Sequence, residues 1–153
     1  MHVLKTKKIT KEEILNLLPY KRPFLFVDEI LTLNEEQIVA QYTFKQDEFF
    51  YEGHFVDRPI TPGVILTECM AQIGLASLGL YLIRDSVKDK APDVAMTSNE
   101  VNYYKLVLPG EKVVVTAIKE YFRFNKLKSK VEMVNDSGTL VAKGFVSGMV
   151  IKY

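Results

Sequence analysis

The stretch GVILTECMAQIGLASLGLYLI, residues 63 to 83, decides the fold because it is long and apolar and carries a single charge, that of Glu68. As a helix it would be about 30 Å long, which is enough to cross a bilayer. The carboxylate of Glu68 and the amide of Gln72 would, however, be costly in hydrocarbon. We therefore interpret the stretch as the buried central helix of a soluble protein, with no membrane as partner.

The rest of the chain supplies elements that are able to cover this helix. A short helix is expected after Thr10, which has Glu13 at capping-box spacing, and it ends at Pro19. Strands in runs, with the helices segregated from them, predict an α+β fold in which one curled antiparallel sheet wraps the central helix. We expect a single domain over residues 1–153. The segments rich in β-branched and aromatic residues predict strands at 24–33, 37–44, 94–104, 108–122, 126–134 and 139–153, with a loop at 84–93.

Composition and charge argue against several kinds of partner and site. The formal charge of +1 gives no indication of a nucleic acid partner. The single cysteine, Cys69, suits a reducing compartment, and the first residues contain no signal-peptide pattern, so we expect a cytoplasmic protein. The two histidines, His2 and His54, occur in no metal-ligand spacing, so we expect no metal.

A cluster of basic residues lies late in the chain and has two interpretations. It is either a solvated strand face with a turn, or a surface that attracts an acidic partner protein and raises the rate of association. Its members are Lys119, Arg123, Lys126, Lys128 and Lys130.

The start of the central helix, Thr61-Pro62-Gly63, suits the stabilisation of negative charge. Thr61 is expected to cap the helix and Pro62 to occupy its first position. Amides in the first turn lack intrahelical acceptors and lie at the positive end of the helix dipole, and glycine lets a ligand approach closely. The amide of Gly63 is thus a candidate donor to a developing oxyanion. The alternative is that these residues only start the helix.

Glu68 is a candidate general acid. Its neighbours are apolar, and burial raises the pKa of a carboxyl group, which keeps it protonated near neutral pH. Gln72, four residues later, is able to hydrogen-bond to the carboxyl group and orient it. The alternative is a structural carboxylate paired with Arg58 or Arg22.

His54 is a candidate general base in the loop before the helix. A neutral imidazole suits the removal of an acidic C–H proton near neutral pH. The alternative is a loop histidine that is exposed or satisfied locally. A base, an acid and an oxyanion donor together indicate the elimination of water from a β-hydroxyacyl compound.

Three stretches resemble the β-hydroxyacyl-[acyl carrier protein] dehydratases of the FabZ/FabA type: LLPYKRPFLFVDEI (17–30), GHFVDRPITPGVILTECMAQIG (53–74) and NEVNYYKLVLPGE (99–111). The resemblance runs from Ile9 to the C-terminus. It implies a hotdog fold, in which the sheet wraps the central helix. It also implies that His54 and Glu68 are catalytic, that the amide of Gly63 polarises the thioester carbonyl, and that Phe55 and Gln72 contribute to substrate binding.

The resemblance further implies partners and an assembly. The substrate is carried on the phosphopantetheine arm of an acyl carrier protein, and no cofactor takes part. The protein is expected to be a homodimer, often assembled into a hexamer as a trimer of dimers. The histidine of one subunit meets the acid of the other, and the acyl chain lies in a tunnel at the dimer interface. With glutamate at position 68, the sequence resembles the branch of the family that does not isomerise the double bond.

The sequence departs from the family pattern after the histidine, where Val56 and Asp57 replace the usual proline and glycine. Because of this departure, the resemblance leaves the preferred acyl chain open. The substrate belongs either to fatty-acid elongation or to a specialised pathway such as that of aryl polyenes. Met96, Tyr103 and Tyr104 are candidates for the tunnel wall, with core packing as the alternative. Two alternative functions for the protein are that of a hotdog acyl-thioesterase and that of a non-catalytic subunit that binds the acyl carrier.

Overall fold

The computed structural model describes residues 8–151, so His2 and the last two residues of the final predicted strand lie outside the described residues. Helices and strands follow in the predicted order. The helices are α1 (Lys11–Leu17), η1 (Phe49–Glu52), α2 (Gly63–Ala71), η2 (Gln72–Ser77), α3 (Leu78–Leu82) and η3 (Arg84–Ser86). The strands are β1 (Glu29–Leu33), β2 (Gln37–Thr43), β3 (Asp93–Tyr103), β4 (Lys112–Arg123), β5 (Lys126–Asn135) and β6 (Leu140–Ile151).

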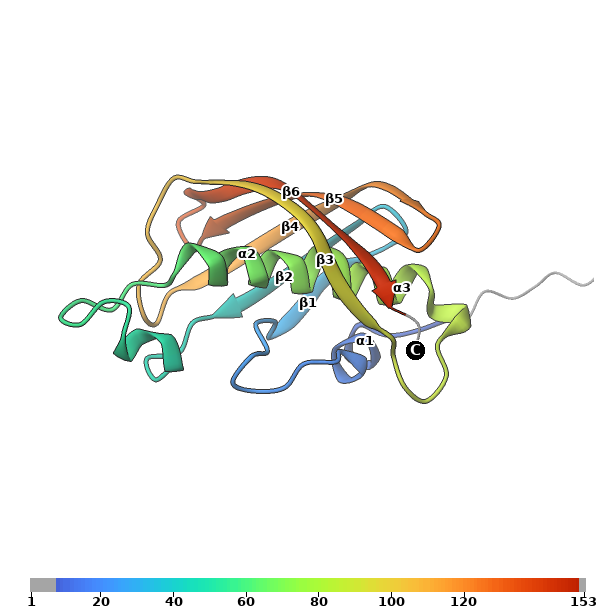
Figure 1. The fold of residues 1–153 in the computed structure, drawn as a ribbon, viewed down its shortest axis with the longest axis horizontal. Coiled ribbons are helices and arrows are strands. Elements are labelled where there is room, and N and C mark those ends of the chain that lie inside the picture. The colour runs from blue at the N-terminus through green and yellow to red at the C-terminus, as the bar shows by residue number, and fades with distance from the viewer. Residues whose placement is uncertain (1–7, 152–153) are drawn as a thin grey trace, which may run out of the picture.

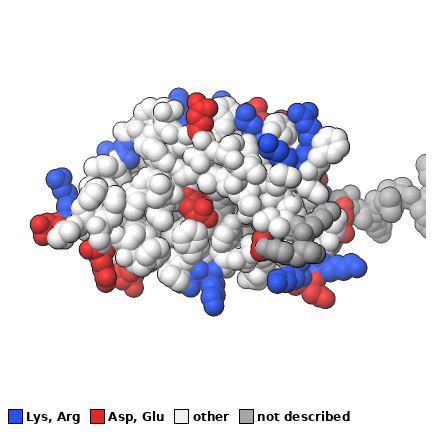
Figure 2. Space-filling view, in the orientation of Figure 1, with Lys and Arg blue, Asp and Glu red and all other residues white. Residues whose placement is uncertain are grey.

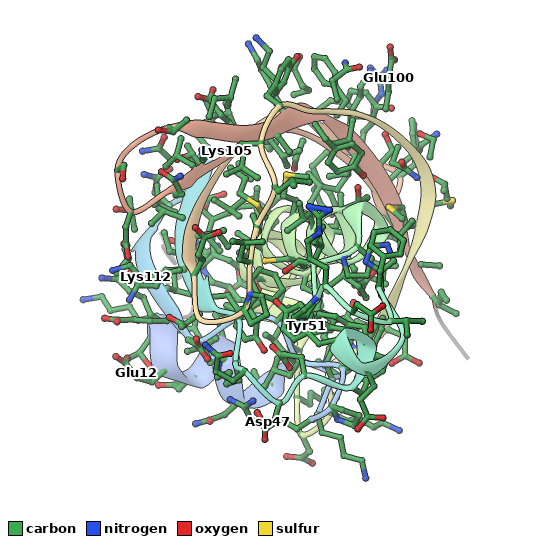
Figure 3. The ribbon with its side chains drawn as sticks, turned by 90° about the vertical axis from the view of Figure 1, so that its left-hand side faces the viewer. Glu12, Asp47, Tyr51, Glu100, Lys105 and Lys112 are labelled. Carbon is green, nitrogen blue, oxygen red and sulfur yellow. The ribbon has the colours of Figure 1, made fainter. Side chains whose placement is uncertain are left out.

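The six strands form one antiparallel sheet that curls around the central helix. Their order is β1-β2-β4-β5-β6-β3, so β1 and β3 are the two edges. Figure 1 shows the sheet behind and above the helix and the edge strand β3 crossing in front of it. Figure 3, viewed from the end of the molecule, shows the helix enclosed by the curve of the sheet. The predicted α+β arrangement is confirmed.

The central helix runs without a break from Gly63 to Leu82. It is long and apolar enough to cross a membrane, but 83% of its most apolar window is buried inside the protein. The inward side chains of β2, β4 and β5 alternate with outward ones and pack against it in one hydrophobic core. The helix is therefore the core helix of a soluble fold, as predicted.

The middle of the helix widens into the π-helical segment η2, which the sequence pattern does not indicate. Its backbone is stabilised by two serine hydroxyl groups. Ser77 Oγ donates to the carbonyl oxygen of Gln72 at 2.7 Å, and Ser129 Oγ of β5 donates to the carbonyl oxygen of Gly74 at 2.7 Å. Such π-helical turns are often found at functional sites.

Two predicted boundaries are corrected. The first strand begins at Glu29 rather than at residue 24. The reason is that the backbone groups of Phe24 and Phe26 form hydrogen bonds with the side chain of Gln72 and not with a neighbouring strand. The strand predicted from 108 begins at Lys112, after a turn in which Gly110 has a φ of +88°. Thr10 does cap α1, and its side chain accepts a bond from the amide of Glu13 at 3.1 Å.

Replacing Gly74 by alanine should destabilise the protein. A Cβ atom at this position would lie 3.0 Å from the Cβ of Ala117 and 3.1 Å from a methyl group of Val131, so helix and sheet would have to move apart. We expect the free energy of unfolding to fall by about 1–3 kcal/mol, measured by urea denaturation at a fixed protein concentration. The matched control is Gly79→Ala, where the nearest contact would be an ordinary 3.7 Å. Equal stability of the two variants would contradict the packing argument.

Candidate active site

Glu68 lies in the second turn of α2 and is half-buried. Burial raises the pKa of its carboxyl group, and the hydrogen bond from Gln72 opposes the rise without cancelling it. Within the described part of the chain no ion pair involves Glu68, and Arg22 pairs with Asp28 instead. The alternative of a structural ion pair is therefore wrong for the described residues.

Gln72 holds Glu68 in place. Its side chain is fully buried and is hydrogen-bonded on both sides of the amide. Nε2 donates to Glu68 Oε1 at 3.1 Å and to the carbonyl oxygen of Phe24 at 2.9 Å. Oε1 accepts from the amide of Phe26 at 2.8 Å. The acid is thereby oriented by a side chain that the backbone before β1 fixes in place, and the predicted contact between Gln72 and Glu68 is confirmed.

His54 lies in the loop between η1 and α2 and is bonded at three points. Its amide donates to the carbonyl oxygen of Phe50 at 3.0 Å, and its carbonyl oxygen accepts from the amide of Ile60 at 2.9 Å. Its ring Nδ1 lies 2.7 Å from the carbonyl oxygen of Ile60. A carbonyl oxygen only accepts, so Nδ1 carries the hydrogen, and in the neutral ring Nε2 then keeps its lone pair. The imidazole is thus held in a tautomer whose Nε2 is able to accept a proton.

Gly63 is the first residue of α2, preceded by Pro62 at the N-cap. The predicted cap is wrong: no side chain caps the helix, because the hydroxyl of Thr61 bonds to that of Tyr51 at 2.6 Å. Figure 3 shows Tyr51 at this end of the molecule, in front of the helix. Among the described residues no acceptor is found for the amide of Gly63. The ring of Tyr103 packs 3.3 Å from where a Cβ would lie, so the absence of a side chain also has a packing reason.

Residues 18–147 match the model of the FabA-like domain. The chain belongs to the FabA-like family. Among curated relatives, the 3-hydroxyacyl-[acyl-carrier-protein] dehydratase FabZ of Petrotoga mobilis is 40% identical over 103 residues, covering 67% of this chain and 70% of the relative. The FabZ of Chlamydia muridarum is 33% identical over 142 residues, covering 92% of this chain and 84% of the relative.

Solved structures confirm the hotdog fold of this FabA-like chain. The dehydratase heterocomplex ApeI:P from Xenorhabdus doucetiae gives a TM-score of 0.78 at 13% identity, covering 95% of this chain and 93% of that one. A thioesterase from Haemophilus influenzae gives 0.67 at 17% identity, with the same coverage of 95% and 93%. At these identities the likeness shows the fold alone.

In the FabA-like chain Glu68 opens into a small pocket of about 150 Å³. The described residues that line it include neither His54 nor any other residue of its loop; they are Tyr20, Glu68, Ala71, Leu75, Val94 and Met96. The two candidate catalytic side chains therefore do not share this pocket within one subunit. Met96 lines this pocket, and its place in a tunnel wall stays a prediction. Tyr103 instead packs on Gly63 and bonds to the hydroxyl of Thr67, and Tyr104 is exposed.

The loop beyond the histidine presents its apolar side chains to solvent. Phe55 stacks on His54, with 3.9 Å between ring centroids, yet it is 54% exposed, and Val56 is 85% exposed. Asp57 is exposed as well. The substitutions that depart from the family pattern thus lie on the surface of the subunit. The described residues contain no cluster of side chains suited to hold a metal ion.

The sequence interpretation missed Tyr20, which lines the pocket of Glu68. The residue stands directly after Pro19 in a loop, far from Glu68 along the chain. Neither periodicity nor spacing brings these two residues together. Tertiary contacts, among them the hydrogen bonds between Gln72 and the segment before β1, place this part of the chain beside the helix.

The raised pKa of Glu68 predicts a pH-dependent gain in stability for Glu68→Gln. The folded protein holds this proton more tightly than the unfolded chain, whose carboxyl titrates near 4.5. The protonated group therefore favours folding below that pH, and this contribution is lost as the pH rises through the raised pKa. We expect the variant to be more stable than the wild type at about pH 8 and equally stable at about pH 4, from urea denaturation. The control is Glu120→Gln on the exposed surface of β4. A difference independent of pH would contradict the prediction.

Proposed function

We propose that the protein is a (3R)-3-hydroxyacyl-[acyl carrier protein] dehydratase, a hydro-lyase that forms trans-2-enoyl thioesters. The observation that carries the proposal is a pair of side chains on a FabA-like chain, each oriented for proton transfer by its own local hydrogen bond. One is a carboxyl group whose pKa is raised by burial and which is held by Gln72 at an open pocket. The other is the imidazole of His54, whose Nε2 is left free by the bond at Nδ1.

In the proposed reaction, Nε2 of His54 takes a proton from C2 of the acyl chain. The resulting negative charge moves on to the thioester oxygen, which accepts a hydrogen bond from the amide of Gly63. The electron pair then returns to form the C2=C3 double bond as the C3–O bond breaks. The leaving oxygen takes the proton of Glu68 and departs as water. His54 ends protonated and Glu68 ionised, and exchange with solvent restores both.

The thioesterase alternative fits the site less well. Several structural neighbours are thioesterases, but they share the fold alone. A carboxyl group that activates water for hydrolysis has to be ionised, whereas burial favours the protonated form of Glu68. The non-catalytic alternative is disfavoured because the chain retains both His54 and Glu68.

We propose that the working unit is a homodimer in which each site combines His54 of one subunit with Glu68 of the other. The edge strand β3 supports this proposal, because it is long, most of its side chains are exposed, and among the described residues it pairs with β6 only. An open edge of this length is a template for a second strand. In Figure 2 the face that β3 crosses is largely free of charge, with acidic atoms in its middle. The hexamer expected from the resemblance would add copies of this dimer.

Mixing two inactive variants should restore activity if the site is shared. His54→Ala and Glu68→Gln should each lower kcat by more than about a hundredfold, because each removes a proton-transfer group. After subunit exchange between equal amounts of the two, random pairing gives half mixed dimers with one intact site each, so about a quarter of wild-type activity should return. The activity is measured as the hydration of an enoyl thioester, which is monitored through the loss of its ultraviolet absorbance. Normal activity of either variant would reject its catalytic role, and no recovery on mixing would reject the shared site.

We propose that the substrate arrives on an acyl carrier protein that docks on the basic cluster of β4 and β5. Figure 2 shows Lys and Arg atoms gathering at the upper right, where Figure 1 has the β4–β5 hairpin. In this part of the chain Lys119 pairs with Glu36, whereas no ion pair is found for the other four described members, Arg123, Lys126, Lys128 and Lys130. Phe124, at the tip of the same hairpin, is 93% exposed. Unpaired cations beside an apolar tip suit an acidic protein surface with an apolar contact.

Reversing two of these charges should slow the reaction of a carrier-bound substrate and leave the reaction of the same acyl group without its carrier unchanged. For Lys126→Glu combined with Lys128→Glu we expect kcat/KM with a carrier-bound substrate to fall roughly tenfold at low salt, because electrostatic steering is lost. The same acyl group on free pantetheine should react as with the wild type. Lys8→Glu, at an exposed position outside the cluster, is the control. An equal loss with both substrates would show damage to the site rather than to docking.

We place the enzyme in the cytoplasm, in keeping with its single, buried cysteine. The acyl chain is proposed to come from fatty-acid elongation, with a carrier-bound polyene as the second candidate. Turnover of a panel of carrier-bound saturated, polyene and aryl-primed hydroxyacyl chains separates the two.

A further inference from the structure

The pocket beside Glu68 contains a second polar side chain, the phenol of Tyr20, which the reaction described above does not use. Tyr20 comes from the loop between α1 and β1 and is half-buried. The other lining residues are apolar: Ala71, Leu75, Val94 and Met96. Tyr20 and Glu68 are thus the two polar side chains of the described lining.

The hydroxyl of Tyr20 is a hydrogen-bond donor for which the described residues supply no acceptor. Burial, with smaller contributions from the charges of Glu68 and Asp93, raises its pKa to about 12, so it stays protonated at neutral pH. Across residues 8–151 no hydrogen bond is found for this hydroxyl, and one oxygen of Glu68 is already bonded to Gln72. Among the described residues no fully buried side-chain oxygen or nitrogen lacks a hydrogen-bond partner, so this hydroxyl is open to the space of the pocket. The acceptor must therefore be a water molecule or a bound ligand.

We propose, on the basis of the dehydratase function above, that Tyr20 is a catalytic residue that holds the oxygen leaving C3. Its hydroxyl donates a hydrogen bond to that oxygen while Glu68 transfers its proton to the same atom. The C3–O bond breaks, both of its electrons stay on oxygen, and the product is a water molecule beside the Glu68 carboxylate. Tyr20 itself neither gains nor loses a proton. In the direction of hydration, the two side chains orient the attacking water.

The shape of the pocket supports this role. A cavity of about 150 Å³ has room for a water molecule, and a bound water needs two or more polar partners. Tyr20 and Glu68 supply these partners between apolar walls, where a hydrogen bond to developing negative charge is stronger than in bulk water. An alkyl chain filling the same space would leave the phenol without an acceptor.

The test is Tyr20→Phe, which keeps the ring and removes the donor. We expect kcat to fall roughly tenfold, as for the loss of one hydrogen bond in the transition state, in both dehydration and hydration. KM and the melting temperature should stay close to wild type. Tyr121→Phe is the matched control, because Tyr121 lies on β4 beside Arg123, outside the pocket.

A second substrate distinguishes a chemical role from a structural one. A 3-chloroacyl thioester loses chloride, which needs no proton, so the penalties of Tyr20→Phe and Glu68→Gln should both shrink markedly. An equal penalty on both substrates would assign Tyr20 a structural role and overturn the proposal, and so would a kcat within about twofold of wild type for the hydroxyacyl substrate. Wild-type protein without dehydratase activity would instead overturn the proposed function itself.

Discussion

The buried amide of Gln72 is the interaction on which the arrangement of the site depends. A fully buried amide has to satisfy its donors and its acceptor within the protein. Gln72 does so with the backbone of Phe24 and Phe26 on one side and the carboxyl group of Glu68 on the other. The same bonds keep the chain before β1 out of the sheet and bring it against the helix. One side chain thus couples the N-terminal segment, the core helix and the candidate acid.

The central helix combines two demands that oppose each other. As the core of the sheet it has to be apolar along its length, and most of it is buried. It nevertheless carries Glu68, whose burial favours the uncharged form of the group. Nothing in the packing of the sheet requires a carboxyl group there. Residues that cost stability in this way are typical of functional sites, where selection retains them for chemistry.

Much of the fold follows from patterns along the chain, whereas its exceptions arise from tertiary contacts. The apolar run from residue 63 and the alternating strands predict the helix and its sheet, and spacing alone singles out Glu68 and Gln72. The late start of β1 could not be predicted, because it depends on a side chain 46 residues away. Thr61 is of a residue type that often caps helices, but its hydroxyl is hydrogen-bonded to that of Tyr51. Competition between possible partners is decided only once the chain has folded.

The separation of His54 from the Glu68 pocket has a physical rationale in the proposed elimination. A base and an acid in direct contact would form an ion pair, and the acid would lose the proton that it has to donate. In the described chain each group is instead held by its own local bonds, His54 by Ile60 and Glu68 by Gln72. A substrate lying between them at the interface of the proposed dimer would meet an imidazole bonded to the chain through Nδ1 and a carboxyl group whose protonated form is favoured by burial. In the proposed dimer, dividing the pair between two subunits would keep the base and the acid out of direct contact until a substrate lies between them.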